Sequence, residues 1–171
     1  MDRRESWFTL SSGKRFYPFN PNPDDIEISD IALALSHLCR YNGHCRLFYS
    51  VAEHSVHCSN YVANGHEFTA LMHDATEAYV GDMIRPIKRF TPNFQEAEEL
   101  VWQAMCSRFD LPREMPEEVH YVDNLILVTE ARDLLPDGAK LMEEWGIPIE
   151  PVLGLDICRN GREPMQPKEA K

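Results

Sequence analysis

Residues 73–88 read HDATEAYVGDMIRPIK and place a histidine beside an aspartate, followed by two more carboxylates and a closing lysine. The mostly apolar run 68–72 leads into this stretch. We therefore expect one helix that packs on the core, carries His73 and Asp74 on its inner wall and breaks at Gly81. Two adjacent ionisable side chains are costly to bury unless they are paired or bind a metal. Because imidazole and carboxylate suit a divalent transition metal, the pair favours a metal site.

Apolar residues recur at helical spacing on both sides of this stretch. Further helices are expected at about 31–40, 51–62, 92–109, 116–135 and 138–145, and Ser29 is the expected N-cap of the first. Strand-forming residues around a Ser-Ser-Gly-Lys turn predict a hairpin over 6–19. The polar tail, about 163–171, is expected to be disordered. The chain is thus predicted to be one domain, 1–171, with an all-α helical core at about 24–146 and a small N-terminal β-hairpin.

Composition narrows the classes of partner and compartment. The net charge of −11 repels polyphosphate backbones, so a nucleic-acid polymer is not an expected partner. A small anionic substrate stays possible if a local basic cluster and a metal supply a positive field. The five cysteines are odd in number and form no CxxC motif, which predicts reduced thiols in a cytoplasmic protein of a bacterium, or of a host cell if the source is viral. Neither a signal peptide nor a membrane association is expected.

Two other residues stand in contexts that suit a metal ligand. His54 is expected in the middle of a helix, and Asp123 lies amid the apolar face of a later one. Together with His73 and Asp74 they could hold one divalent ion and leave positions open for water and phosphate. Each residue also has a simpler interpretation: His54 as a hydrogen-bonded helix histidine with His57 as a competing ligand, and Asp123 as a surface or capping carboxylate.

The motifs AEHS at 52–55, HDATE at 73–77, GD at 81–82 and PIK at 86–88 resemble those of the HD-domain metal-dependent phosphohydrolases. The resemblance is closest to the short bacterial 5′-deoxynucleotidases and the phage dATP triphosphohydrolases, and it covers about 40–123, roughly half of the chain. It implies a helical HD-domain bundle with one metal ion. By position, the implied metal ligands are His54, His73, Asp74 and Asp123.

The resemblance also implies roles for residues around the metal. Glu77 and Asp82 would be the acidic pair beside the attacking water, although it leaves open which acts as acid and which as base. Glu77 lies four residues after His73, so a continuous helix would place both on one face. Without the motif, solvent exposure would be the simpler expectation for the two acids.

Substrate contacts follow from the same resemblance. Lys88 and Arg40 would contact phosphate, and Tyr41 stands where relatives usually carry tryptophan and could stack on a sugar or base. The change from tryptophan leaves the base preference open. Further candidates for a basic cluster at the opening of the site, for each of which a solvated surface charge is the simpler explanation, are Arg46, Arg85 and Arg89.

The leading hypothesis is a metal-dependent phosphohydrolase acting on deoxynucleotides, with water attacking the 5′ α-phosphate. Two reactions fit the same residues: a 5′-nucleotidase acting on dNMP, and a dNTP triphosphohydrolase with a dATP preference. The expected cofactor is one Co, Mn, Zn or Fe ion, with Mg on the substrate phosphates as an option, and a homo-oligomer is expected. The alternative is a non-catalytic, metal-stabilised nucleotide-binding or interaction module.

Overall fold

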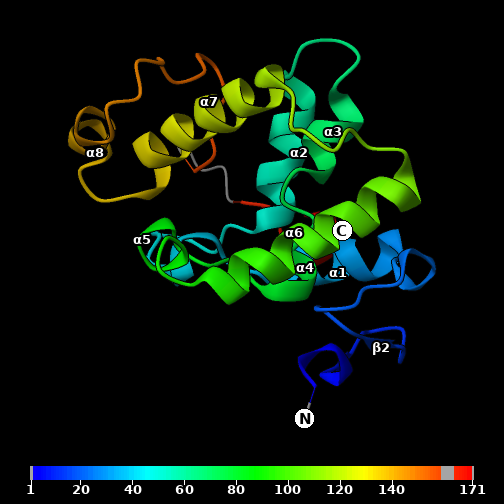
Figure 1. Cartoon of the computed structure of the whole chain (residues 1–171). Coiled ribbons are helices and arrows are strands. Elements are labelled where there is room, and N and C mark those ends of the chain that lie inside the picture. The colour runs from blue at the N-terminus through cyan, green and yellow to red at the C-terminus, as the bar shows by residue number, and fades with distance from the viewer. Residues whose placement is uncertain (1, 159–163, 171) are drawn as a thin grey trace.

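Helices make up most of the chain, and a two-stranded hairpin lies at its N-terminal end (Figure 1). The structure is a computed structural model that describes residues 2–158 and 164–170. It confirms the expected mostly helical fold with a small β-hairpin. The elements are η1 (Arg3–Glu5), β1 (Phe8–Thr9), β2 (Arg15–Phe16), η2 (Pro23–Asp25), α1 (Ile28–His37), η3 (Arg40–Gly43), α2 (Val51–Tyr61), α3 (Glu67–Met72), α4 (Glu77–Val80), α5 (Arg85–Lys88), α6 (Pro92–Phe109), α7 (Glu117–Leu134), α8 (Gly138–Trp145) and α9 (Pro167–Ala170).

The contacts that fix the hairpin to the bundle include one aromatic side chain and one carboxylate. β1 and β2 pair antiparallel, with Phe8 opposite Phe16. The buried ring of Phe16 lies 4.1 Å, centroid to centroid, from that of Tyr79 on α4. Asp30 of α1 accepts a hydrogen bond of 2.8 Å from the backbone N–H of Ser12 in the turn. The hairpin therefore belongs to the same folded unit as the helices.

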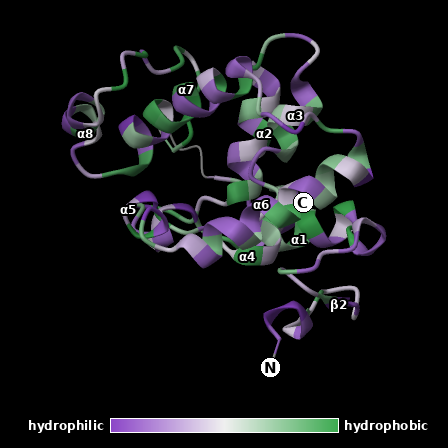
Figure 2. Cartoon of the chain, viewed as in Figure 1, coloured by the Kyte–Doolittle hydropathy of each residue, from purple (hydrophilic) through white to green (hydrophobic). Residues whose placement is uncertain are grey.

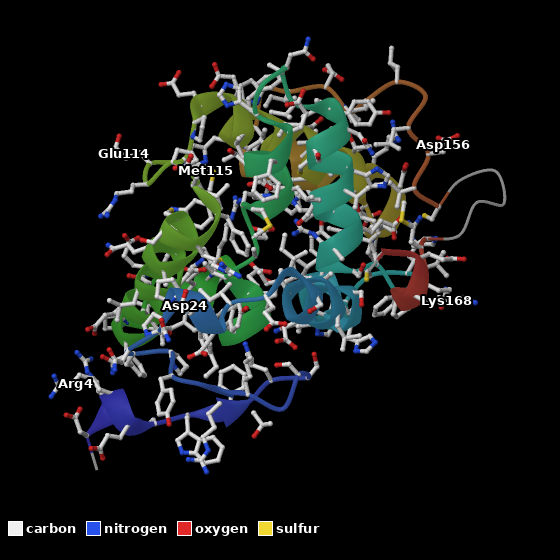
Figure 3. All side chains as sticks on the ribbon, turned by 90° about the vertical axis from the view of Figure 1, so that its right-hand side faces the viewer. Arg4, Asp24, Glu114, Met115, Asp156 and Lys168 are labelled. Carbon is white, nitrogen blue, oxygen red and sulfur yellow. The ribbon has the colours of Figure 1, made fainter. Side chains whose placement is uncertain are left out.

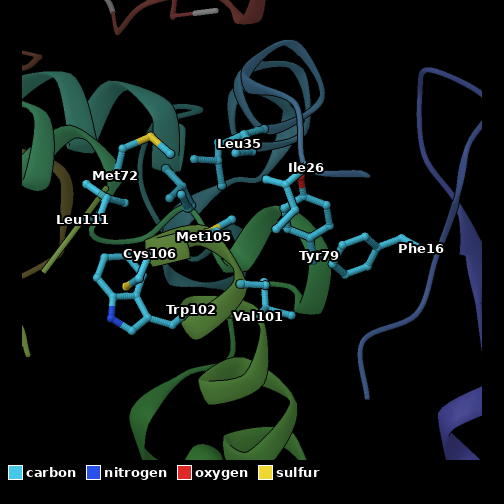
Figure 4. Packing of buried hydrophobic residues seen from close by; sticks show 14 of the residues in the cluster. Phe16, Ile26, Leu35, Met72, Tyr79, Val101, Trp102, Met105, Cys106 and Leu111 are labelled. Atoms are coloured by element: carbon cyan, nitrogen blue, oxygen red, sulfur yellow. The ribbon is translucent and has the colours of Figure 1, made fainter. Parts of the chain in front are cut away.

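Two groups of buried side chains hold the helices together. Polar and apolar residues are mixed along the helices, as the colours of Figure 2 show, and the longer helices α6 and α7 each carry a set of buried residues for the interior. The first group joins α1, α4 and α6, and includes Ile26, Tyr79, Val101 and Met105 (Figure 4). The second lies mainly among α2, α3 and α7. The elements that carry the predicted ligands thus meet between the two groups.

The prediction of a single helix around the His-Asp pair is wrong. α3 ends at Met72 and α4 begins at Glu77, with turns over 73–76. Backbone N–H groups in this segment bond three residues back, as Glu77 N–H does to Asp74 O at 3.0 Å, and this pattern winds the chain more tightly than an α-helix. The predicted break at Gly81 is confirmed, since its φ of 87° favours glycine.

Three smaller expectations also need correction. Ser29 is not an N-cap, because α1 begins at Ile28 with Glu27 in the capping position. α5 was not anticipated. The tail was expected to be disordered, but in its described part, 164–170, the backbone N–H of Met165 donates to Glu53 Oε2 at 2.7 Å and α9 packs beside α1 and α2. Figure 3 shows Lys168 on this helix at the edge of the molecule. Glu163 and Lys171 lie outside the described residues.

Candidate metal centre

Three segments far apart in the sequence bring the predicted ligands together. Ser50 caps α2 by accepting a hydrogen bond from the Glu53 N–H, and this start places His54 at the fourth residue of the helix, fully buried. The turn between α3 and α4 carries His73 and Asp74, and α7 carries Asp123. Because α2 packs on both α3 and α7, the side chains from these segments converge.

The candidate ligand atoms of these four residues lie close enough together to bind one metal ion. His54 Nε2 lies 3.3 Å from His73 Nε2, 3.2 Å from Asp123 Oδ1 and 3.7 Å from Asp74 Oδ2. His73 Nε2 lies 3.3 Å from Asp74 Oδ2 and 3.9 Å from Asp123 Oδ1. Metal bonds of about 2.0–2.2 Å in a tetrahedral arrangement separate the ligand atoms by about 3.4 Å. The spacing therefore fits one transition-metal ion.

Hydrogen bonds fix which nitrogen of each imidazole can bind a metal. His54 Nδ1 donates to the ionised carboxylate of Glu130 at 2.5 Å, and His73 Nδ1 donates to the carbonyl oxygen of Ala70 at 2.7 Å. In the neutral rings both Nε2 atoms then carry lone pairs. These lone pairs face each other and the oxygens of two carboxylates. Such a group of acceptors is stabilised by a cation, and the residues present fit a metal ion.

The charges at the centre support this interpretation. Burial opposes ionisation of Asp123, but hydrogen bonds with His54 and His73 outweigh it and hold the pKa of Asp123 well below its ordinary value. Burial likewise disfavours charged His73, but the facing Asp74 and Asp123 carboxylates raise the pKa of this imidazole well above its usual range. The pocket therefore attracts positive charge strongly.

Glu130, which the sequence did not single out, contacts His54 on the side of the ring that faces away from the other proposed ligands. Its fully buried carboxylate accepts hydrogen bonds from His54 Nδ1, from the Tyr41 hydroxyl at 2.6 Å and from Arg40 Nε at 3.1 Å. Burial opposes its charge, but Arg40 and His54 lower the pKa of Glu130 to about 2. The residue lies seven positions after Asp123, two turns along α7, so its spacing was a usable signal.

Cys58 was also missed as part of the centre. It lies one turn after His54 on α2, is fully buried and has its Sγ 3.4 Å from His54 Nε2. The ligand atoms of His54, Cys58 and His73 all lie within 4.8 Å of one another. This buried cluster could hold a metal ion without any contribution from the carboxylates.

The two predicted catalytic acids lie beside the ligands. Glu77 has a buried oxygen, Oε2, that accepts no hydrogen bond within the described chain. Burial and the nearby charges of Asp74 and Asp82 raise the pKa of Glu77 well above its ordinary value. Burial, together with Asp74, also raises the pKa of Asp82. Since the helix is broken after Met72, Glu77 reaches this position from a separate helix, α4, and not from the face that carries His73.

Arg40 and Tyr41 contact the centre itself. Arg40 is largely buried, and besides Glu130 it contacts Asp74, with NH1 3.4 Å from Oδ2. Tyr41 adopts a left-handed φ of 57°, and this conformation accompanies the hydrogen bond of its hydroxyl to Glu130. Both residues therefore support the ligands, a role that the sequence analysis did not assign to them.

The basic residues after Gly81 divide into two groups. Lys88 Nζ lies 2.5 Å from Glu98 Oε1 on α6, so its charge is paired away from the ligands. Arg85, one of the further candidates for a basic cluster at the opening of the site, has NH2 3.6 Å from Asp123 Oδ2 while 65% of its side chain is exposed. Arg85 therefore combines contact with a proposed ligand and access from solvent.

Comparisons with other proteins identify relatives in two bacteria. A protein of Escherichia coli, named uncharacterized protein YfdR, is 46% identical over 144 residues, which cover 84% of this chain and 81% of that protein. Uncharacterized protein RCAP_rcc00048 of Rhodobacter capsulatus is 35% identical over 126 residues, or 68% of this chain and 64% of that protein. No protein-family model matches the chain. Within the described residues, no helix is long and apolar enough to cross a bilayer. The extent and identity of the first match show that the chain belongs to the same family as YfdR.

Proposed function

We propose that this protein is a metal-dependent phosphohydrolase of the HD-domain type that acts on deoxynucleotides. One observation carries the proposal: two imidazole nitrogens and two carboxylate oxygens, from three separate segments, lie 3.2–3.9 Å apart with their lone pairs converging. The ligands of the ion would be His54, His73, Asp74 and Asp123. An ion held there would lower the pKa of bound water and polarise a phosphoryl oxygen.

Glu77 and Asp82 supply the acid–base chemistry in this proposal. The pKa of each carboxyl is raised, so each holds a proton more strongly than a solvated carboxylate does, as a general acid requires. One orients or deprotonates water while the other protonates the leaving oxygen of the nucleoside. The unpartnered Oε2 of Glu77 is free to make such a hydrogen bond.

A cavity of about 260 Å³ that Asp82 helps to line is suited to the nucleoside part of the substrate. Its lining is mostly apolar and includes Phe94, with Asp82 and the amide of Asn42 as polar groups. Its volume is close to the lower end for small-molecule sites, about 300 Å³. A larger cavity of about 550 Å³ is lined by Glu117 and Glu118, whose charges would repel phosphate. The smaller cavity is therefore the better candidate.

The distribution of positive charge favours a substrate with a single phosphate. Arg85 is exposed beside Asp123, whereas Arg40 already contacts two carboxylates and Lys88 is paired with Glu98. A triphosphate would need more free cations to neutralise its additional phosphates. A dNMP 5′-nucleotidase is thus preferred over a dNTP triphosphohydrolase.

One feature favours the alternative of a non-catalytic, metal-stabilised nucleotide-binding module. All three residues expected to contact substrate make internal contacts: Arg40 with Glu130 and Asp74, Tyr41 with Glu130, and Lys88 with Glu98. The contacts of Tyr41 and Lys88 would have to open for either side chain to reach a nucleotide. The retained pair of acids beside the ligands still favours an enzyme.

A product profile tests the proposal. The purified protein is incubated with the four dNMPs and the four dNTPs, in Mn²⁺, Co²⁺ or Zn²⁺ and in EDTA, and orthophosphate and triphosphate are quantified separately. We expect metal-dependent orthophosphate release from dNMPs. Triphosphate release would identify the other reaction. Nucleotide binding without any product, in every metal, would support the binding module and refute the enzyme.

Variants test the roles of individual residues. His73→Ala and Asp74→Ala are expected to lose both the metal and nearly all turnover. Glu77→Gln keeps the size of the side chain and is expected to keep the metal but lose about 10²–10⁴-fold in rate, since it acts on protons and not on the ion. Full activity with full metal content in His73→Ala would refute the assignment of the ligands.

A further inference from the structure

We propose that Cys58 is an additional ligand of the metal centre and that its sulfur makes the centre selective for thiophilic metals. This inference rests on the metal centre of the proposed function, but it does not depend on the reaction. The thiol belongs to the same helix as His54, one turn further on, and both side chains are fully buried. A helix fixes such a pair of side chains on one face.

The distance between the two side chains fits shared coordination. Bonds of about 2.3 Å to sulfur and about 2.0–2.1 Å to nitrogen separate the two ligand atoms by about 3.1 Å at a right angle and about 3.6 Å at a tetrahedral angle. Cys58 Sγ lies 3.4 Å from His54 Nε2, between these limits. The ligand nitrogen of His73 lies within 4.8 Å of both atoms, so one ion could contact all three residues.

A simple S–H···N hydrogen bond to His54 is the competing explanation for this contact. It would use the Nε2 lone pair that also faces Asp123 Oδ1 at 3.2 Å and His73 Nε2 at 3.3 Å. One thiol proton cannot satisfy all of these acceptors, whereas one cation can. The crowding of acceptors around this nitrogen therefore favours the sulfur as a fellow ligand.

Coordination has a defined proton balance and a chemical consequence. The Cys58 thiol releases one proton to solvent as its sulfur forms the bond to the divalent ion, and no electron is transferred. A thiolate beside two imidazoles favours Zn²⁺, Co²⁺, Fe²⁺ and the probe ion Cd²⁺, whereas carboxylates alone suit Mg²⁺ and Mn²⁺. The centre should therefore discriminate between these two groups of metals.

The test uses the full chain, stripped of metal by a chelator and titrated with Co²⁺ in the absence of substrate. A thiolate bound to Co²⁺ gives a charge-transfer absorption in the near ultraviolet. We expect this band to saturate at one equivalent in the unchanged protein. Cys58→Ser should bind Co²⁺ without the band, and Cys106→Ser, which replaces a buried thiol on α6, should keep it.

Metal competition gives a second measurement. Cys58→Ser should lose at least about tenfold in Cd²⁺ affinity and much less in Mn²⁺ affinity. A saturated Co²⁺ complex of the unchanged protein without the band would overturn the proposal without requiring any variant, as would a band that persists in Cys58→Ser. The reaction is judged separately: a band without phosphate release leaves Cys58 as a ligand and refutes the enzyme, while phosphate release without the band refutes only the sulfur ligand.

Discussion

Replacing Glu130 by glutamine should weaken metal binding although Glu130 is not a ligand. Its carboxylate accepts hydrogen bonds from His54, Tyr41 and Arg40, and the 2.5 Å contact fixes the proton on His54 Nδ1. Glutamine keeps the shape but loses the charge and replaces one acceptor oxygen with a donor NH₂. The new donor must face either His54 Nδ1 or the two donors Tyr41 and Arg40, and the preference of His54 for a free Nε2 lone pair is weakened.

Glu130→Gln is expected to have two separate effects, one on metal affinity and one on the free energy of unfolding. Loss of an outer hydrogen-bond partner of a metal-bound histidine typically reduces metal affinity about 10–100-fold, which corresponds to about 1.4–2.7 kcal/mol. Removing one partner of a buried ion pair costs about 3–5 kcal/mol of unfolding free energy. Because Arg40 retains Asp74 at 3.4 Å, the lower end of that range, about 3 kcal/mol, is expected for folding.

Glu53→Gln is the matched control for this measurement. Glu53 is also fully buried and is the neighbour of His54 in sequence, but its Oε2 accepts a hydrogen bond from the Met165 backbone and makes no contact with His54 Nδ1. Metal affinity is measured by competition with a chromophoric chelator, and stability by urea unfolding of the metal-free proteins. If Glu130→Gln folds and binds metal as tightly as the unchanged protein, or if both variants lose the same affinity, the positioning role of Glu130 is refuted.

Three further predictions concern metal, pH and packing. Metal at 100 times its dissociation constant should stabilise the protein by about 2.7 kcal/mol, a rise of about 5–10 °C in Tm in scanning calorimetry, and His73→Ala should abolish that rise. Burial opposes the charge of Asp30, but hydrogen bonds from the hairpin turn lower the pKa of its carboxyl. The stabilisation by this carboxylate is therefore present above pH 3.8 and is lost as the pH falls through the lower pKa of the folded state. Asp30→Asn should lower the free energy of unfolding by about 1.5–3 kcal/mol at pH 7, and urea titrations in acid should show no difference between the two proteins. Gly138→Ala would place a Cβ atom 1.9 Å from the Ala131 carbonyl oxygen and should lower the urea midpoint strongly. Gly154→Ala is the control, because its Cβ atom meets open space and costs only about 1–2 kcal/mol for the positive φ. Similar losses in the two variants would contradict the structure.

Two of the later helices could be predicted with their limits because local sequence signals mark both of their ends. The helix expected at 92–109 is observed with the same limits, and so is that at 138–145. Around the His-Asp pair the apolar pattern continues without a break, yet the helix stops at Met72. The hydrogen bond of His73 to Ala70 and the tighter turns after it depend on what α2 and α7 place opposite. Such tertiary effects leave no periodic signal in the sequence.

That the four proposed ligands lie together could be predicted from their motifs, whereas the residues that contact them have no motif. His54 and Asp123 were expected near the pair, and the structure brings their ligand atoms within 3.2 Å. Glu130 has no motif, although a glutamate two turns after Asp123, inside the buried run 126–131, indicates a charge that needs partners. The positive φ of Tyr41, which accompanies its contact with Glu130, cannot be deduced from a tyrosine before Asn-Gly.

In the proposed function, the position of Arg40 would link the support of the metal ligands to the binding of substrate. Its guanidinium lies between Glu130, which orients His54, and Asp74, a proposed ligand. A phosphate that approached the ion would compete with Asp74 for the same guanidinium, whose NH1 is only 3.4 Å from Oδ2 and poorly placed for a strong hydrogen bond. Because the contact with Glu130 uses Nε and leaves the two terminal NH₂ groups available, Arg40 could, in the proposed function, donate to a phosphate without releasing Glu130 and the His54 that it orients. An arginine is required for this double contact, since lysine offers one nitrogen where two are needed.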